Sequence, residues 1–295
     1  PRVDPSHAQR TLLWNLDSRD WDRVLLDAFG IDSALLPRCV PTHSPFGSIE
    51  TSVGAIPLTT VTGDQGAAIF ASGTPAIGTT SVNLGTGAFI QVVAEGRAPV
   101  GFLTSIAADR TTVWEGVVNG AAAAIAGEAE RDGIENWDAQ DLDRWLDGTG
   151  DPPLFLNGVS GLGSPHWIAD FPSAFIGDGS PTARLAAVAE SIVFAVAANL
   201  RALGAHTPIR TIEAMGGLSR SQRLLGRLAT VTGLSVQRRD DPEATVRGLA
   251  FLTVERPSDW TSPPPSKVPT DGWLGEPIIK RYHTWLRAMQ NAVDR

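Results

Sequence analysis

The sequence predicts an α/β protein in which helices pack on a β-sheet. Residues 79–84, 89–93 and 111–117 have the β-branched or alternating pattern of strands. From residue 210 onward, strand-like and helix-like runs alternate, which is typical of α/β layer folds. Apolar residues make up 42% and charged residues 19% of the 295 residues, so the chain has the composition of a globular protein with a sizeable core.

The first 72 residues are mixed and rich in turns. Residues 17–29 have helical spacing, with their large apolar side chains on one face. Residues 58–61 are a short β-branched run that is typical of a buried strand. This run leads into a Gly-Asp-Gln-Gly segment at residues 63–66, and a helix is expected to begin directly after it.

The rest of the chain predicts five helices and three more strands. The helices are expected at residues 120–129, 181–203, 220–231, 244–254 and 279–293. The strands are expected at residues 154–156, 210–214 and 235–238. Residues 132–150 are polar, which indicates a surface insertion, and residues 257–277 are rich in proline, which indicates a loop.

Composition argues against several function classes. The net charge is −8 and no run of Lys or Arg is longer than two, so no nucleic-acid surface is expected. The apolar segment 185–203 contains Glu190, Asn199 and Arg201, which indicates a buried helix rather than a membrane span. The single cysteine, Cys39, cannot form an internal disulfide, which favours a reducing compartment such as the cytoplasm. The five histidines have no metal-ligand spacing, and no P-loop is present.

Asp64 is the first candidate for chemistry. It follows a strand-like run and has a glycine on each side of the Asp64-Gln65 pair, so its carboxylate is expected to be exposed enough to reach a substrate. A carboxylate in this position can accept the proton of a hydroxyl that attacks phosphorus. The alternative is that Asp64 is the N-cap of the following helix, a position that favours Asp.

The second candidate is the segment Asn-Leu-Gly-Thr-Gly-Ala-Phe at residues 83–89. Gly85 and Gly87 allow the backbone to approach a phosphate, consecutive N–H groups form an anion-binding nest, and the Thr86 hydroxyl adds a donor. The alternative is a plain hairpin turn.

The third candidate is the segment Gly-Gly-Leu-Ser-Arg-Ser at residues 216–221. Gly216 and Gly217 allow a flat ligand such as adenine to lie against the backbone, and the N-terminus of the next helix favours anions. The alternative is a strand-to-helix turn with a serine cap.

These loops, with the residues between them, resemble the FGGY family of carbohydrate kinases. The segments that carry the resemblance are TVTGDQGAAIF at 60–70, SVNLGTGAFIQV at 81–92, LFLNGVSGLGSPHW at 154–167, residues 211–233, and EATVRGLAFL at 243–252. The GTGAF core is most similar to glycerol kinases, and the resemblance extends over nearly the whole chain.

The resemblance implies an actin-like ATPase fold of the ribonuclease H-like type. Residues 1–72 correspond to the end of the N-terminal, substrate-binding domain, and residues 73–295 correspond to the complete C-terminal, nucleotide-binding domain. The implied reaction is ATP-dependent phosphoryl transfer to a primary hydroxyl of a sugar or polyol, with Mg²⁺ bridging the phosphates.

The family's functional residues correspond to ten positions of this sequence. Asp64 matches the general base, and the residues implied to contact the acceptor are Asp64, Gln65 and Phe89. The residues implied to contact the nucleotide are Gly85, Thr86, Gly87, Gly120, Gly216, Gly217 and Ser221. The resemblance does not identify a metal ligand.

Two departures from the family pattern affect the expectation. The family's N-terminal portion, with its first phosphate loop and most sugar-binding side chains, has no counterpart here, so this chain is expected to have little activity alone. Its expected macromolecular partners are a separate N-terminal half or a second copy. Ala124 stands where glycerol kinases usually have a polar residue, which favours a ketose or another sugar over glycerol. The alternative function is a non-catalytic actin-like module that binds nucleotide or a partner.

Overall fold

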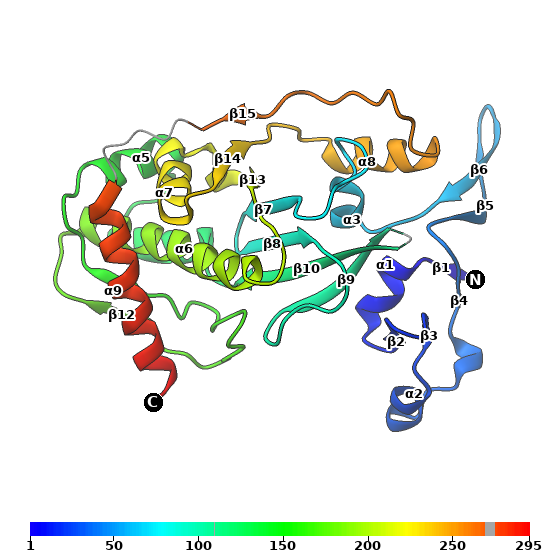
Figure 1. The fold of residues 1–295 in the computed structure, drawn as a ribbon, viewed down its shortest axis with the longest axis horizontal. Helices are drawn as coiled ribbons and strands as arrows, with labels where there is room; N and C mark the ends of the chain where they lie inside the picture. Colours follow the sequence, from blue (N-terminus) through cyan, green and yellow to red (C-terminus); the bar gives the residue numbers. More distant parts are fainter. Residues whose placement is uncertain (109, 269–274) are drawn as a thin grey trace.

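The fold was analysed in a computed structural model that describes residues 1–108, 110–268 and 275–295. Within them, one mixed sheet contains seven strands, which are β7 (Thr80–Leu84), β8 (Ala88–Val93), β9 (Leu103–Ala108), β10 (Thr111–Val118), β13 (Thr211–Met215), β14 (Ser235–Arg238) and β15 (Ser266–Lys267). Their spatial order is β15-β14-β13-β7-β8-β10-β9 (Figure 1). The predicted strands of this sheet are confirmed, whereas β9 and β15 were not predicted.

The sheet combines a hairpin meander with parallel strands. β7 and β8 form the predicted hairpin, in which Asn83 lies opposite Phe89. β8, β10 and β9 continue as antiparallel neighbours. On the other side, β13 runs parallel to both β7 and β14. The C-terminal ends of β7 and β13 therefore lie side by side, and the two glycine-containing turns that follow these strands are brought together.

The two faces of the sheet differ in polarity. Along β7, Thr80, Val82 and Leu84 are buried on one face, whereas Ser81 and Asn83 point to the opposite face. Helices cover the buried face, namely α4 (Ala122–Arg131), α5 (Ala139–Asp147), α6 (Pro181–Gly204), α7 (Gln222–Thr232) and α9 (Gly275–Val293) (Figure 1). The polar face is only partly covered, by α3 (Asp64–Ala68) and α8 (Ala244–Thr253).

The central helix of the buried layer is α6, which contacts β8, β10, α4, α5 and α7. Ser180 caps its N-terminus and Pro181 occupies its first turn. By length and composition α6 is apolar enough to cross a membrane, but 83% of its most apolar window is buried inside the protein. This burial is what a core helix requires.

The helix α3 is held between β9 and α8. A Cβ atom added at Gly66 would lie 2.3 Å from the carbonyl oxygen of Ala107 on β9. Next to α3, the ring of Phe70 stacks on Phe251 of α8, with centroids 6.4 Å apart. The N-terminal part of the chain is thus packed firmly onto the sheet.

The remaining elements belong mostly to the first 60 residues. They are β1 (Arg2–Val3), α1 (Pro5–Ala8), η1 (Gln9–Thr11), β2 (Trp14–Asn15), β3 (Asp20–Trp21), α2 (Arg23–Phe29), η2 (Ser33–Leu35), β4 (Arg38–Cys39), β5 (His43–Thr51) and β6 (Gly54–Thr60). Farther along the chain are β11 (Leu154–Leu156), β12 (Ala174–Ile176) and the 3₁₀-helix η3 (Gly217–Arg220). The side-chain amide of Gln9 exchanges two hydrogen bonds with the backbone of Ile106 and so fixes α1 and η1 to β9.

Four local predictions were wrong or incomplete. The helix predicted over residues 17–29 begins only at Arg23, because Asp22 caps it. The strand predicted at residues 58–61 is the last part of β6, which begins earlier, at Gly54; within it Leu58 and Thr59 are half-buried and Thr60 is buried, whereas the rest of the β5–β6 hairpin is mostly exposed (Figure 1). The supposed insertion at 132–150 contains α5, whose Leu142 and Leu146 are fully buried. The predicted loop at 257–277 includes β15 and the start of α9, and its residues 269–274 lie outside the described residues.

Candidate active site

Asp64 is the first residue of α3 and is exposed. Gly63, not Asp64, occupies the N-cap position, so the capping alternative for Asp64 is wrong. The Asp64 carboxylate accepts one hydrogen bond from the backbone N–H of Gln65, at 2.7 Å. The serine hydroxyl of Ser6 accepts a hydrogen bond from Gly63 N–H at 2.7 Å and anchors the loop before the helix. The carboxylate therefore projects from a fixed backbone into an open space.

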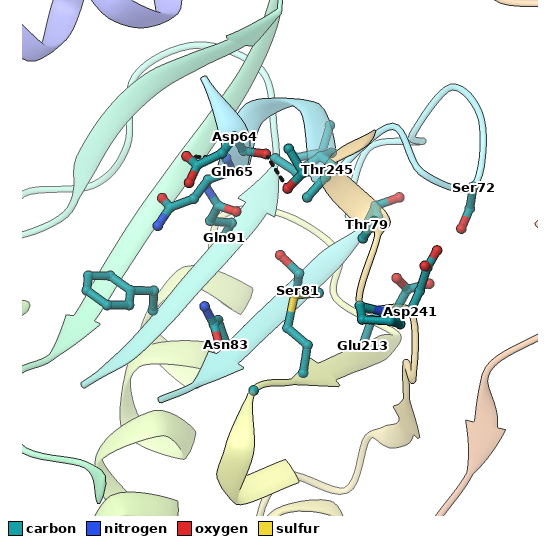
Figure 2. Close-up of a pocket in the computed structure, with 18 residues that line it drawn as sticks. Asp64, Gln65, Ser72, Thr79, Ser81, Asn83, Gln91, Glu213, Asp241 and Thr245 are labelled. Atoms are coloured by element: carbon teal, nitrogen blue, oxygen red, sulfur yellow. Dashed lines mark hydrogen bonds between the residues drawn. The ribbon is translucent and has the colours of Figure 1, made fainter. Parts of the chain in front are cut away.

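That open space is a cavity of about 320 Å³ beneath α3 and α8, which we call the central cavity (Figure 2). Its floor is the polar face of the sheet, and it brings four of the predicted site residues together, namely Asp64, Gln65, Phe89 and Gly216. Further lining residues include Ser81, Asn83, Gln91, Glu213, Met215, Asp241 and Thr245. The segments that carry Asp64, Phe89 and Gly216 therefore face one another, as the predicted reaction requires.

The carboxylates of the central cavity are largely compensated by arginines. Glu213 forms a two-pronged ion pair with Arg239, at 2.7 and 2.9 Å, and Asp241 pairs with Arg247 at 2.9 Å. Asp64 has no ion pair with any described residue. In residues 1–108, 110–268 and 275–295, no group of three or more His, Cys, Asp or Glu side chains forms a metal site. This donor set fits Mg²⁺ only as an ion held mainly by phosphate oxygens and water, which is its usual mode in kinases.

A second space adjoins the β7–β8 turn, with a volume of about 440 Å³, and we call it the turn cavity. Gly85, Thr86 and Gly217 line it, together with Trp137, which lies just before α5, and with residues of α5 and η3. A Cβ atom at Gly217 would meet no atom within 4 Å, and one at Gly85 would meet none closer than 3.8 Å. Both glycines therefore offer bare backbone to the cavity, which is the surface that a phosphate or a flat ring requires.

Neighbouring glycines line the two cavities, since Gly216 lines the central cavity and Gly217 lines the turn cavity. Gly216 has φ +89°, and a Cβ atom there would lie 2.5 Å from Asn83 Oδ1 and 2.6 Å from the carbonyl oxygen of Leu84. Only glycine permits this approach of the paired-glycine turn to the end of β7.

Gly87 and Gly120 have packing roles in this structure. A Cβ atom at Gly87 would lie 3.0 Å from the carbonyl oxygens of Val118 and Asn119. Gly120 lines neither the central nor the turn cavity, and a Cβ atom there would lie 2.7 Å from Val159. Its predicted contact with nucleotide stays a prediction.

Ser221 is also outside both cavities. The residue is completely buried, and its hydroxyl accepts a hydrogen bond from the Leu224 N–H, at 3.0 Å, as the N-cap of α7. The same hydroxyl donates to the Asp143 carboxylate. The capping alternative is therefore confirmed for Ser221, and its predicted adenine contact stays a prediction.

Sequence reasoning missed most of the cavity floor. Ser81, Gln91 and Glu213 line the central cavity, although none of them was a candidate. The available signal was the polar residue at every second position of an otherwise apolar strand. Ala122 was missed as well, and it lines the turn cavity while its N–H donates to the carbonyl oxygen of Gly85 at 3.0 Å.

Comparison with known proteins assigns most of the chain. Residues 80–254 match the FGGY family of carbohydrate kinases, C-terminal domain, and residues 2–71 match the N-terminal domain of the same family. A glycerol kinase of Rippkaea orientalis is 32% identical over 98% of this chain and 62% of its own length. The chain thus spans about three fifths of the length of that relative.

Solved structures share the fold. A xyloylose kinase from Brucella ovis superposes with a TM-score of 0.83 at 24% identity, over 98% of this chain and 65% of that one. The Plasmodium falciparum glycerol kinase with ADP superposes with a TM-score of 0.80 at 19% identity, over 99% and 63%. These likenesses confirm the predicted actin-like α/β fold.

Proposed function

Because this chain belongs to the FGGY family of carbohydrate kinases, we propose that it carries the general base and the nucleotide contacts for ATP-dependent phosphorylation of a sugar or polyol. The observation that supports this most is the central cavity, which the Asp64 carboxylate shares with Phe89 and the paired-glycine turn. A base, an acceptor contact and a nucleotide contact in one space are the parts that this reaction needs.

In the proposed reaction, the primary hydroxyl of the acceptor lies within hydrogen-bond reach of Asp64. Its oxygen attacks the γ-phosphorus of ATP, and the new O–P bond forms as the bond to the β-phosphate oxygen breaks. The hydroxyl proton passes to the Asp64 carboxylate, and ADP leaves with the electron pair of the broken bond. The α3 N-terminus holds Asp64, and Phe89 offers an exposed ring for the carbon chain of the acceptor.

The turn cavity is the proposed nucleotide site. The bare backbone of Gly217 and the ring of Trp137 would bind adenine, while the Thr86 hydroxyl and the N–H groups beside it would bind phosphate. Mg²⁺, when bound with the nucleotide, would offset the negative charge of the phosphates. Of the three described carboxylates that line the central cavity, Glu213 and Asp241 are already paired with arginines. Asp64 is therefore the one that would face an ion at the γ-phosphate.

Asp64→Asn tests the proposal. ATP consumption would be measured with glycerol, xylulose, ribulose and gluconate, and nucleotide binding by calorimetry. We expect turnover to fall by about 10² to 10⁴ in the variant, since Asn is a poor proton acceptor, while the dissociation constant for ATP changes little. The matched control is Asp178→Asn, which alters an exposed aspartate outside the three segments.

Unchanged turnover in Asp64→Asn would remove the residue from its role. ATP binding without phosphorylation of any acceptor, in the wild-type chain and in a longer protein that includes the N-terminal domain, would support the non-catalytic binding module instead. Because the chain spans 62% of its curated relative, both proteins should be assayed.

A further inference from the structure

A second polar cavity opens on the other side of Asp64. Its volume is about 310 Å³, and it lies between the N-terminal segment of α1 and η1, the start of α3, and strands β8, β9 and β10. We call it the α1 cavity. Besides Asp64 and Gln65, its polar lining consists of Ser6, His7, Gln9, Arg10, Gln91 and Glu115. None of the phosphate-side or adenine-side glycines lines it.

The α1 cavity and the central cavity share one wall. Asp64, Gln65 and Gln91 line both spaces, and Figure 2 shows these three side chains grouped together at the upper end of the sheet. The proposed base therefore lies between the central cavity, which a candidate nucleotide-binding glycine lines, and the α1 cavity, which none of these glycines lines. Two spaces on either side of the base suit phosphoryl transfer, because the acceptor must approach the γ-phosphorus from the side opposite to the leaving group.

The hydrogen bonds identify which groups of the α1 cavity are available to a ligand. Ser6 and Gln9 are fully used: Ser6 bonds to Asp4 and Gly63, and Gln9 bonds twice to Ile106. By contrast, the Gln91 amide makes one side-chain hydrogen bond within the described residues, from its Nε2 to Glu115 Oε1 at 3.3 Å. Its carbonyl oxygen and second N–H are therefore left for a ligand.

Glu115 and Arg10 form a continuous polar row with Gln91. Glu115 lies directly across the strand pair from Gln91 and is only 7% exposed. Arg10 donates to both of its carboxylate oxygens, at 2.9 and 3.3 Å, and keeps further N–H donors for a ligand. Adjacent amide, carboxylate and guanidinium groups offer paired donors and acceptors, which suit the neighbouring hydroxyls of a carbohydrate.

We propose that the α1 cavity binds the end of the acceptor that lies farther from the reacting hydroxyl, beyond the part that contacts Phe89, and that Gln91, Glu115 and Arg10 select the hydroxyls at this end. This inference rests on the proposed kinase function and specifies its substrate class. The acceptor is a neutral ketose or polyol of about five carbons, because Asp64, Gln91, Glu115 and Arg10 together offer partners for more hydroxyls than the three that glycerol carries. A sugar acid is disfavoured, because its carboxylate would meet Asp64 and Glu115 with one arginine already paired.

The test is a comparison of kcat/KM for xylulose, ribulose, ribitol, glycerol and gluconate. We expect the five-carbon neutral acceptors to be used at least about tenfold better than glycerol or gluconate. Glu115→Gln should lower kcat/KM for the five-carbon acceptors by about tenfold or more and should change the value for glycerol by less than about threefold. Gln91→Leu keeps the Arg10–Glu115 pair and should lower the five-carbon values by about three- to tenfold.

The matched control is Glu128→Gln. Glu128 is also a buried carboxylate paired with arginines, at 2.6 Å to Arg184 and 3.1 Å to Arg131, but it lies on α4, outside the α1 cavity. It should leave the ratio between acceptors unchanged. Ligand-observed NMR with ribitol and xylulose gives a second readout that does not depend on turnover, and their binding should be weakened by Glu115→Gln and not by Glu128→Gln.

Three results would overturn the inference. The first is a kcat/KM for glycerol as high as that for the five-carbon acceptors. The second is an equal loss of kcat/KM for all acceptors in Glu115→Gln and Gln91→Leu. The third is that no five-carbon acceptor binds or reacts. The kinase proposal fails separately, through unchanged turnover in Asp64→Asn. Turnover that depends on Asp64 but not on Glu115 or Gln91 would therefore leave the kinase proposal standing and refute the acceptor site.

Discussion

Gly248 of α8 lies directly against the carbonyl oxygen of Ala67 in α3, so that a Cβ atom added at position 248 would be 1.8 Å from that oxygen. The Thr245 hydroxyl, one turn earlier on α8, donates to the carbonyl oxygen of Asp64 at 3.3 Å. The helix that carries the proposed base is thus positioned by backbone contact with a helix more than 180 residues later in the chain.

Gly248→Ala should therefore displace α3. The added methyl group faces backbone rather than a movable side chain, so we expect the free energy of unfolding to fall by about 1 to 3 kcal/mol. We also expect faster hydrogen exchange at the amides of α3 and lower turnover. Denaturant unfolding and hydrogen exchange would measure these effects. In Gly127→Ala, by contrast, an exposed helical glycine with no atom within 4 Å of its Cβ position is replaced, and this should stabilise the protein slightly. Equal behaviour of the two variants would contradict the positioning role of Gly248.

Gly217→Val should weaken nucleotide binding without lowering the stability of the fold. The backbone of Gly217 is compatible with other residues and its Cβ position faces open space, so the free energy of unfolding should change by less than about 1 kcal/mol. The valine side chain would fill the surface on which adenine is proposed to lie, and calorimetry should show ATP binding weakened by about tenfold or more. Gly150→Val also places a side chain in open space, outside the turn cavity, and serves as the control. Undiminished ATP affinity in Gly217→Val would place the adenine elsewhere.

Ser221→Ala should act mainly on stability. The substitution removes the cap of α7 and the hydrogen bond to Asp143, and we expect a loss of about 1 to 3 kcal/mol in the free energy of unfolding. Because the side chain is buried away from the turn cavity, ATP affinity should change by less than about threefold. A stable variant with strongly reduced ATP affinity would instead support the direct contact that the family resemblance implies.

Cys39 should react slowly with alkylating reagents while the protein is folded. Burial, followed by the nearby carboxylates of Asp4 and Asp20, raises the pKa of its thiol to about 11 from 9.0. At pH 8 the thiolate fraction should be about 100-fold lower than in the unfolded chain, and iodoacetamide labelling should be slower to a similar extent. The stabilisation that accompanies this raised pKa is complete below pH 9 and is lost as the pH rises toward 11. Labelling of the folded protein as fast as that of the chain unfolded in guanidinium would contradict the expected protection.

The local sequence pattern was sufficient to predict those helices and strands whose determining residues lie close together in the chain. The β7–β8 hairpin, the strand β14 and the capped helix α6 agree closely with the predicted ranges. Period-two and period-3.6 patterns and capping residues act over one or two turns of chain, and they need no knowledge of distant segments. The same pattern predicted a strand at residues 58–61 but not its earlier start at Gly54 or the half-buried state of Leu58 and Thr59, because the extent and burial of a strand depend on the distant segments that pair with it and cover it.

The sequence alone thus determined the fold class and the family resemblance, and it identified Asp64, Thr86 and the paired glycines as candidate site residues, since these lie in contiguous segments. Only the tertiary structure decided that Gly120 and Ser221 lie outside the two nucleotide-side cavities, and that Gln91, Glu115 and Arg10 form one polar row beside Asp64. The reason is physical: strand pairing and helix packing join residues that are far apart in the chain, and no local pattern records which distant partner will complete a site.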